Sequence, residues 1–233
     1  MRAEVILSPA EYGLHDVTGK TAIVIDIFRF TTTVLTALEA GIDRFYPVAE
    51  VEEAWALKEA DPQLRLAGER QSLKIPGFDF GNSPLEHYGR SYAGGDLACS
   101  TTNGTRAIHA ATKAKEVVLA SLRSANAVAA YVRDCGRDVV IFPAGLEGKF
   151  SLEDTWCAGL ILADLGAQEL GDGARTAKLV CEQIDRHELV NTTHGKRLQN
   201  LGLHGDLAFC LELDRSSGVI IWDQASGWGA LKR

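Results

Sequence analysis

Apolar and polar positions follow two patterns that alternate along most of the chain. Short apolar runs such as TAIVIDIF at 21–28 and EVVLAS at 116–121 predict buried β-strands. Between such runs, stretches with apolar residues at helical spacing, such as VEEAWALKEAD at 51–61 and ANAVAAYVRDC at 125–135, predict helices. The same patterns predict further strands at 44–48, 64–68, 96–100, 138–145 and 218–222, and further helices at 31–41, 104–114, 151–166 and twice within 173–202.

Strands that alternate with helices are typical of a mainly parallel sheet covered on both faces. We therefore predict an α/β fold, a three-layer α/β/α arrangement with a mainly parallel sheet. A weak internal repeat of about 72 residues places Thr33 on Thr105, and two similar intertwined subdomains explain it about as well as the general regularity of α/β chains does. No linker-like stretch divides the chain, so we expect one compact domain, 1–233, in which two similar halves would span about 1–95 and 96–233.

Composition narrows the classes of function. The 233 residues are 46% apolar and 24% charged, as in ordinary globular proteins, and carry a net charge of −7. That charge argues against nucleic acid or an anionic membrane as a partner, since either needs a broad basic surface. The chain shows no apolar run of the ~20 residues that a membrane span needs and no signal peptide at its start. Five cysteines without a CxxC pair suggest reduced thiols and a cytoplasmic protein.

Candidate chemistry lies where predicted strands end, because ligands of α/β sheets gather at the carboxyl ends of the strands. Asp26 ends the strand at 21–28, and Arg29 follows in the turn. Asp26 could hold a metal ion, attack phosphorus or cap the next helix. The haloacid-dehalogenase phosphatases carry a second aspartate two positions after the first, where this chain has Phe28. A mechanism of that type would therefore lack its general acid here.

Three more strand-end clusters carry ionisable or amide groups. AGER provides Glu69 and Arg70, which a solvated ion pair would also explain, and GFDFGNSP provides Asp79, Asn82 and Ser83. In a separate cluster, GLEGKFSLED ends with Asp154 at the third position of a predicted helix after a serine cap, so this carboxylate could be structural or could face the site.

The stretch STTNGTR offers an anion cradle, because a helix N-terminus presents free N–H groups and a glycine allows close approach of the backbone. Its candidate residues are Thr101, Thr102, Asn103, Gly104 and Thr105, and a plain helix cap is the alternative. Cys99 precedes this stretch, but six residues separate it from Arg106, where tyrosine-type cysteine phosphatases have five. Cys99 therefore reads as a buried strand residue and not as a nucleophile.

In this order, VIDIFRFTTT, AGER, GFDFGNSPLE, TTNGT and PAGLEGKFSLED resemble the 2-phosphosulfolactate phosphatase family. The similarity runs from about 24 to 154 and continues more weakly through HGDLAFCLELD near the C-terminus. The resemblance implies a Mg²⁺-dependent phosphoric monoester hydrolase of coenzyme M biosynthesis, which converts 2-phosphosulfolactate to sulfolactate and phosphate. Phe30 departs from the family, which usually has a small residue there, and this change could reshape the pocket beside Arg29.

On this reading Asp26, Glu69 and Asp154 are catalytic, and Asp26, Glu69 and Asp79 are metal ligands. The substrate would be bound by Arg29, Arg70, Asn82, Ser83 and residues 101–105. Attack by metal-activated water is the favoured step, and a phosphoaspartate on Asp26 is its rival. The alternatives are a phosphatase for another small phosphorylated carboxylic acid and a non-enzymatic anion-binding protein. The partner expected is a small anionic phosphorylated substrate, and a homodimer stays open.

Overall fold

The sheet is the central feature of the computed structural model, which describes residues 1–232. It contains eleven strands in the order β5-β4-β6-β3-β11-β10-β7-β2-β8-β1-β9. Their bounds are β1 (Arg2–Val5), β2 (Thr21–Ile25), β3 (Arg44–Val48), β4 (Arg65–Arg70), β5 (Leu73–Lys74), β6 (Asp96–Ser100), β7 (Glu116–Ala120), β8 (Val139–Pro143), β9 (Glu169–Leu170), β10 (Ile220–Asp223) and β11 (Trp228–Leu231).

The helices connect these strands and cover both faces of the sheet. Their bounds are α1 (Phe30–Glu39), α2 (Val51–Ala60), α3 (Gly104–Ala110), α4 (Ala125–Cys135), α5 (Leu152–Leu165), α6 (Asp172–Gln183), α7 (Thr193–Asn200) and α8 (His204–Cys210). Short 3₁₀ helices are η1 (Pro9–Leu14), η2 (Pro84–Glu86), η3 (Leu122–Ser124) and η4 (Arg186–Asn191).

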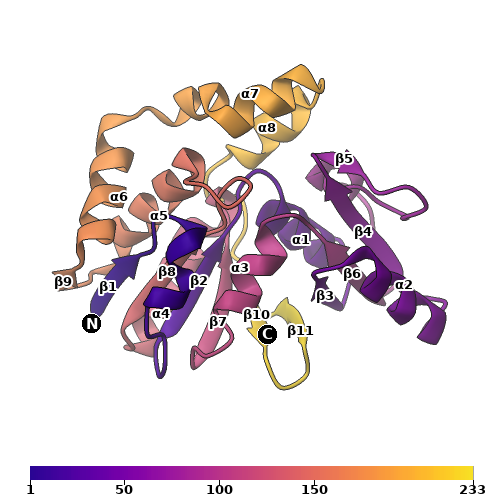
Figure 1. The fold of residues 1–233 in the computed structure, drawn as a ribbon, viewed down its shortest axis with the longest axis horizontal. Coiled ribbons are helices and arrows are strands. Elements are labelled where there is room, and N and C mark those ends of the chain that lie inside the picture. The colour runs from indigo at the N-terminus through magenta and orange to yellow at the C-terminus, as the bar shows by residue number, and fades with distance from the viewer. Residues whose placement is uncertain (233) are drawn as a thin grey trace.

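Two parallel sections make up the sheet, and an antiparallel hairpin joins them. Strands β4, β6 and β3 are parallel to one another, as are β7, β2, β8, β1 and β9. The hairpin β10–β11 pairs antiparallel with β7 on one side and β3 on the other, and Figure 1 shows it in yellow between the two sections. Because β1 and β2 pair with β8, the sections do not coincide with residues 1–95 and 96–233.

The core forms on both faces because successive residues of a buried strand point to opposite sides. In β2, Ile23 and Ile25 pack with the apolar residues of α4 and α5, whereas Ala22 and Val24 pack with those of α1 and α3. Helix α2 covers the other section of the sheet. The predicted three-layer α/β/α fold with a mainly parallel sheet is therefore confirmed.

Most predicted elements form, and the differences have local causes. Helix α3 ends at Ala110, short of the predicted 114. Strands β1 and β11 and helix α8 were not predicted, because each has only four to seven residues and so gives a weak periodic pattern. None of the helices within 1–232 is both long and apolar enough to cross a membrane.

Candidate active site

A cavity of about 300 Å³ opens at the carboxyl ends of β2, β4, β6 and β8. Its lining is polar and brings together segments from across the chain. It consists of Asp26, Phe28, Arg29, Glu69, Arg70, Gln71, Ser72, Asn82, Thr102, Asn103, Leu146, Glu147, His194 and Arg197. The strand-end rule therefore located the cavity, because all five of the predicted polar clusters contribute residues to it.

Asp26 lies one residue beyond β2 and is 6% exposed. Burial raises the pKa of this carboxyl to about 6; His194 opposes the shift, and the neighbouring Glu69 carboxylate adds to it. Across residues 1–232, no ion pair involves Asp26 or Glu69. Asp26 is therefore a buried acid whose charge lacks a partner cation.

Glu69 is the penultimate residue of β4 and fixes the walls of the cavity. One of its oxygens accepts a hydrogen bond from the Ser72 N–H at 2.7 Å, and the other accepts one from the Thr102 N–H at 2.9 Å. Gln71 and Ser72 both adopt left-handed φ values, 54° and 67°, which close the tight turn into β5. Glu69 thereby joins this turn to the loop after β6.

Two buried or half-buried arginines face the cavity in fixed orientations. Arg29 is 4% exposed, and its Nη1 donates to Asp206 Oδ2 at 2.8 Å while its Nη2 donates to the Ser72 carbonyl at 2.8 Å. Arg70 donates to the carbonyls of Glu69 and Ala49 and to Ser100 Oγ, at 2.9 to 3.0 Å. Each guanidinium keeps further N–H groups for an anion, because arginine has five.

Two of the predicted site residues, Asp79 and Ser83, lie outside the cavity and have structural partners instead. Asp79 is about half-exposed and accepts from the Leu66 N–H at 2.8 Å, near the start of β4, whereas Glu69 lies near its end. The Ser83 hydroxyl donates to Asp206 Oδ1 at 2.6 Å. The structure therefore does not bring Asp79 together with Asp26 and Glu69, and Ser83 supports the partner of an arginine.

Asp154 is also buried behind the cavity and not in its lining. Its Oδ1 accepts from the Ile27 N–H at 2.9 Å and its Oδ2 from the Gly145 N–H at 3.3 Å, which ties the turn after β2 to the loop after β8. Burial, with the charges of Glu153 and Asp26, raises the pKa of Asp154 well above its usual value. Ser151 caps its helix as predicted. This geometry suits a positioning role.

Only part of the predicted anion cradle, residues 101–105, lines the cavity. Thr102 and Asn103 line the cavity, whereas Thr101 and Thr105 bond to each other across the start of α3, where Thr105 N–H donates to Thr101 Oγ1. Gly104 is buried against Phe30 and Asp26. Arg106 is exposed on α3, and Cys99 is buried in β6, where burial raises the pKa of its thiol. A cysteine nucleophile has no support in this geometry.

Sequence reasoning missed three ionisable residues of the lining. His194 and Arg197 lie on α7, which does not follow a strand, so the strand-end rule could not find them. The His194 Nδ1 lies 3.2 Å from the Glu153 carboxylate, which leaves Nε2 for a ligand or water. Glu147 lies within the predicted cluster GLEGKFSLED but was not singled out, and it pairs with Arg197 at 2.7 Å.

Asp26 and Glu69 are the side chains that could hold a metal ion here. No group of three or more His, Cys, Asp or Glu side chains within 1–232 is arranged as a metal site. Mg²⁺ usually takes only one or two carboxylates, with waters and substrate oxygens as its other ligands. A buried carboxylate without a partner cation, beside a second carboxylate, fits that mode of binding.

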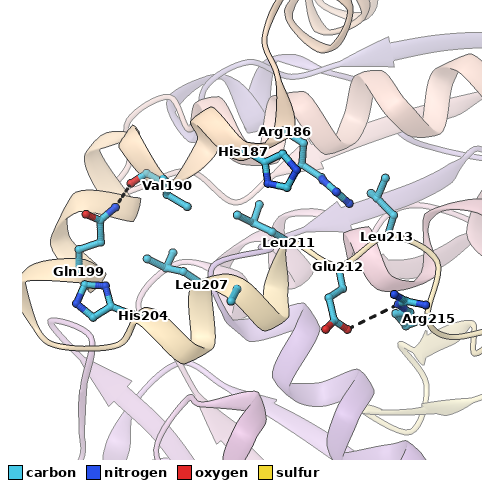
Figure 2. A pocket seen from close by; sticks show the side chains of 11 residues that line it. Arg186, His187, Val190, Gln199, His204, Leu207, Leu211, Glu212, Leu213 and Arg215 are labelled. Atoms are coloured by element: carbon cyan, nitrogen blue, oxygen red, sulfur yellow. Dashed lines mark hydrogen bonds and ion pairs between the residues drawn. The ribbon is translucent and has the colours of Figure 1, made fainter.

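A larger cavity of about 670 Å³ lies between η4, α7, α8 and the segment after it (Figure 2). None of the predicted site residues lines it. Its polar groups partly satisfy one another: Gln199 donates to the Val190 carbonyl at 2.6 Å, and Arg215 lies 4.0 Å from Glu212. The smaller cavity, with its buried carboxylates and oriented arginines, is therefore the candidate active site.

Comparison with known proteins agrees with the resemblance seen in the motifs. Residues 6–225 match the family described as 2-phosphosulpholactate phosphatase. The chain is 40% identical over 219 residues to a probable 2-phosphosulfolactate phosphatase of Clostridium perfringens (strain 13 / Type A), which covers 90% of this chain and 89% of the relative. It is 38% identical to one of Carboxydothermus hydrogenoformans (92% and 90% covered) and 37% identical to one of Thermotoga petrophila (91% and 91% covered). The chain therefore belongs to the 2-phosphosulpholactate phosphatase family and is a phosphoric monoester hydrolase.

Proposed function

We propose that this enzyme is a Mg²⁺-dependent phosphatase that hydrolyses 2-phosphosulfolactate to sulfolactate and phosphate. The observation that carries the proposal is the small cavity in which Asp26 and Glu69 face Arg29 and Arg70. Relatives that cover about nine-tenths of the chain bear the name of this activity, which supports the substrate. A volume of about 300 Å³ suits a small phosphorylated acid.

The two arginines would bind anionic oxygens of the substrate. A carboxylate and a carbonyl oxygen already hold the Arg29 guanidinium, and two carbonyl oxygens and a hydroxyl hold that of Arg70. The remaining donors of each are therefore oriented before substrate arrives. The Thr102 hydroxyl and the backbone and side-chain N–H groups of Asn103 belong to residues that line the same cavity, and they would add donors. A substrate with phosphate, carboxylate and sulfonate groups needs this number of donors.

The chemical step we propose is direct attack by water. The water oxygen bonds to phosphorus, the ester P–O bond breaks, and the sulfolactate oxygen takes up a proton. Asp26 is placed to accept the proton that water loses, and His194, held by Glu153, to supply the proton to the leaving group. Mg²⁺ held by Asp26 and Glu69 would neutralise negative charge that develops on the phosphoryl group.

The test is phosphate release from a panel of phosphorylated small acids, which includes 2-phosphosulfolactate, 2-phospholactate and 2-phosphoglycolate. We expect turnover of 2-phosphosulfolactate with Mg²⁺, loss of turnover in EDTA and its return with added Mg²⁺. Full turnover in excess chelator, with no metal in the protein, contradicts the metal dependence. Turnover of another acid without turnover of 2-phosphosulfolactate supports the alternative substrate class.

Asp26→Asn separates a chemical role from a structural one, because it removes the charge and keeps the size. We expect a folded variant whose kcat falls by orders of magnitude while its KM changes far less. Acid-quenched enzyme analysed by mass spectrometry distinguishes direct water attack from a phosphoaspartate on Asp26. A folded variant with near-normal kcat would exclude both roles for this residue.

A further inference from the structure

We infer that Arg197 binds one of the two acidic groups of the substrate that are not transferred, and that Glu147 competes with this group for the same guanidinium. The inference rests on the proposed function, since it concerns how the same cavity recognises an ester with a second anionic group. Both residues line the cavity, Arg197 from α7 and Glu147 from the loop after β8. Their side chains meet at 2.7 Å.

Arg197 differs from the other cationic groups of the cavity in how it is held. Arg29 donates two buried hydrogen bonds to protein oxygens, and Arg70 donates three partly buried ones. The imidazole of His194 bonds to the buried Glu153. The guanidinium of Arg197 bonds to Glu147 alone among the described residues. It is therefore the cation that can exchange its partner without breaking the core.

Because the Arg197–Glu147 ion pair is partly exposed, breaking it costs little free energy. The side chains of Arg197 and Glu147 are 32% and 54% exposed. Exposed ion pairs contribute little to stability, because water solvates both charges and salt screens them. An anion that is already anchored elsewhere in the cavity can therefore displace Glu147 from the guanidinium.

A neighbouring groove offers anions a route to Arg197. This groove, of about 550 Å³, shares Gln71 and Arg197 with the cavity and is otherwise lined by Leu73, Thr193, Lys196, Asn200 and Leu201. Its lining holds two cationic side chains and no acidic one. Such a surface attracts small anions, and Arg197 stands where the groove meets the cavity.

The backbone around Glu147 is fixed, so its side chain can move while its loop stays in place. The Glu147 N–H donates to Asn103 Oδ1 at 3.0 Å, which ties the loop to the segment after β6. Leu146 and Lys149 close the loop through paired backbone hydrogen bonds of 3.0 Å. Replacement of the Glu147 carboxylate should therefore alter the competition for Arg197 and leave the cavity wall intact.

The test compares the binding of sulfolactate and of inorganic phosphate by isothermal titration calorimetry to wild type, Arg197→Gln and Glu147→Gln. Sulfolactate carries both acidic groups that are not transferred, and phosphate carries neither. We expect Arg197→Gln to weaken sulfolactate binding about tenfold, as for a lost hydrogen bond between charged groups, and Glu147→Gln to strengthen it. Phosphate binding should change less than about twofold in both variants. Arg175→Gln and Glu182→Gln, exposed on α6, are controls with the same changes of charge.

Weaker sulfolactate binding to Arg197→Gln together with stronger binding to Glu147→Gln is the result that supports the inference. Unchanged sulfolactate binding in Arg197→Gln, weaker binding in Glu147→Gln, or no sulfolactate binding to wild type overturns it. An equal loss of phosphate and sulfolactate binding also overturns it, because Arg197 would then act on every anion. If sulfolactate binds as expected but 2-phosphosulfolactate is not hydrolysed, the proposed function fails and the inference stands.

Discussion

The charge of Asp26 is unfavourable in the folded protein, because the carboxylate is buried near Glu69 and has no ion-pair partner. Its folded-state pKa of about 6 lies above the ordinary value of 3.8, so the folded state binds the proton more tightly than the unfolded state. This residue therefore lowers stability as the pH rises from about 4 to about 6, and the loss is complete above that range. A functional carboxylate that costs stability is a common feature of active sites.

Asp26→Asn should consequently stabilise the metal-free protein at pH 8, by an amount on the order of 3 kcal/mol, which is the free-energy equivalent of the pKa shift. The difference should shrink below pH ~6 and vanish near pH ~4, where wild type is protonated as well. Urea unfolding in EDTA across this pH range measures it. Asp134→Asn, exposed on α4, should show no such pH dependence, and a less stable Asp26→Asn at pH 8 would contradict the argument.

Cys99 offers a second prediction for a single residue. It is buried in β6, where burial raises the pKa of its thiol, and it does not line the cavity. A raised pKa keeps the thiol protonated and unreactive. Cys99→Ala should keep kcat within about threefold of wild type, whereas loss of a nucleophile would cost orders of magnitude. Steady-state phosphate release by the folded variant decides between these outcomes.

At the scale of elements, two helix N-termini meet beside the Asp26 carboxylate. Gly104 opens α3 directly against Phe30, the first residue of α1. A Cβ at Gly104 would collide with the Phe30 ring and would lie 2.8 Å from Asp26 Oδ2. Phe30 is fully buried and packs edge-on against Phe45, so the ring has little room to yield. The bulky residue in α1 thus depends on a glycine in α3.

Gly104→Ala should therefore reduce both stability and activity. We expect a loss in unfolding free energy of about 1–3 kcal/mol from overpacking and a fall in kcat/KM of at least about tenfold from displacement of Asp26. Adding Phe30→Ala should make the cost of Gly104→Ala smaller than in wild type, which a double-mutant cycle detects, without restoring activity. Gly13→Ala, with open space around it, is the control, and additive stability effects would refute the contact.

For the whole molecule, sequence reasoning succeeded where local pattern and sheet geometry decide the outcome. The runs that predicted strands at 44–48 and 96–100 match β3 and β6, because a buried strand needs a continuous apolar segment. Asp26 and Glu69 were placed in one cavity because each lies at the carboxyl end of a parallel strand. Each strand was predicted from residues near each other in the chain, and the general geometry of parallel sheets then placed the two strand ends together.

Sequence reasoning failed where contacts between distant segments determine the position of a side chain. No local pattern shows that α7 would place His194 and Arg197 over strand ends that precede it by many residues. Asp79 lies in a polar loop like Asn82, but its carboxylate turns to the start of β4 and not to the cavity. Asp154 has the helix-start position expected of a cap, and the bonds to two other loops emerge only from the fold.

One long-range contact holds the active site to the C-terminal part of the chain. Arg29 and Asp206, 177 positions apart, form an ion pair of 2.8 Å whose side chains are 4% and 3% exposed. Ser83 donates to the second oxygen of Asp206, and the Ser72 carbonyl accepts from the second nitrogen of Arg29. This network joins the start of α1, the turn after β4, the segment before η2 and α8. Arg29, which lines the cavity, is thus oriented by a helix that does not line it.

Asp206→Asn should destabilise the protein by about 3–5 kcal/mol, because it leaves a buried guanidinium without its counter-charge. It should also raise the KM for the phosphorylated substrate more than it lowers kcat, since Arg29 would lose its orientation while Asp26 keeps its place. Arg29→Met combined with Asp206→Asn should be more stable than Asp206→Asn alone, because no unpaired charge stays buried, yet it should not regain substrate affinity. Urea unfolding and steady-state kinetics of the variants separate the two effects.

The control is Glu169→Gln, which breaks an exposed ion pair with Arg2. The side chains of Arg2 and Glu169 are 58% and 68% exposed, so the loss of this pair should lower the unfolding free energy by less than ~0.5 kcal/mol. An Asp206→Asn protein as stable as the Glu169→Gln protein would show that the buried pair does not hold the two parts of the chain together.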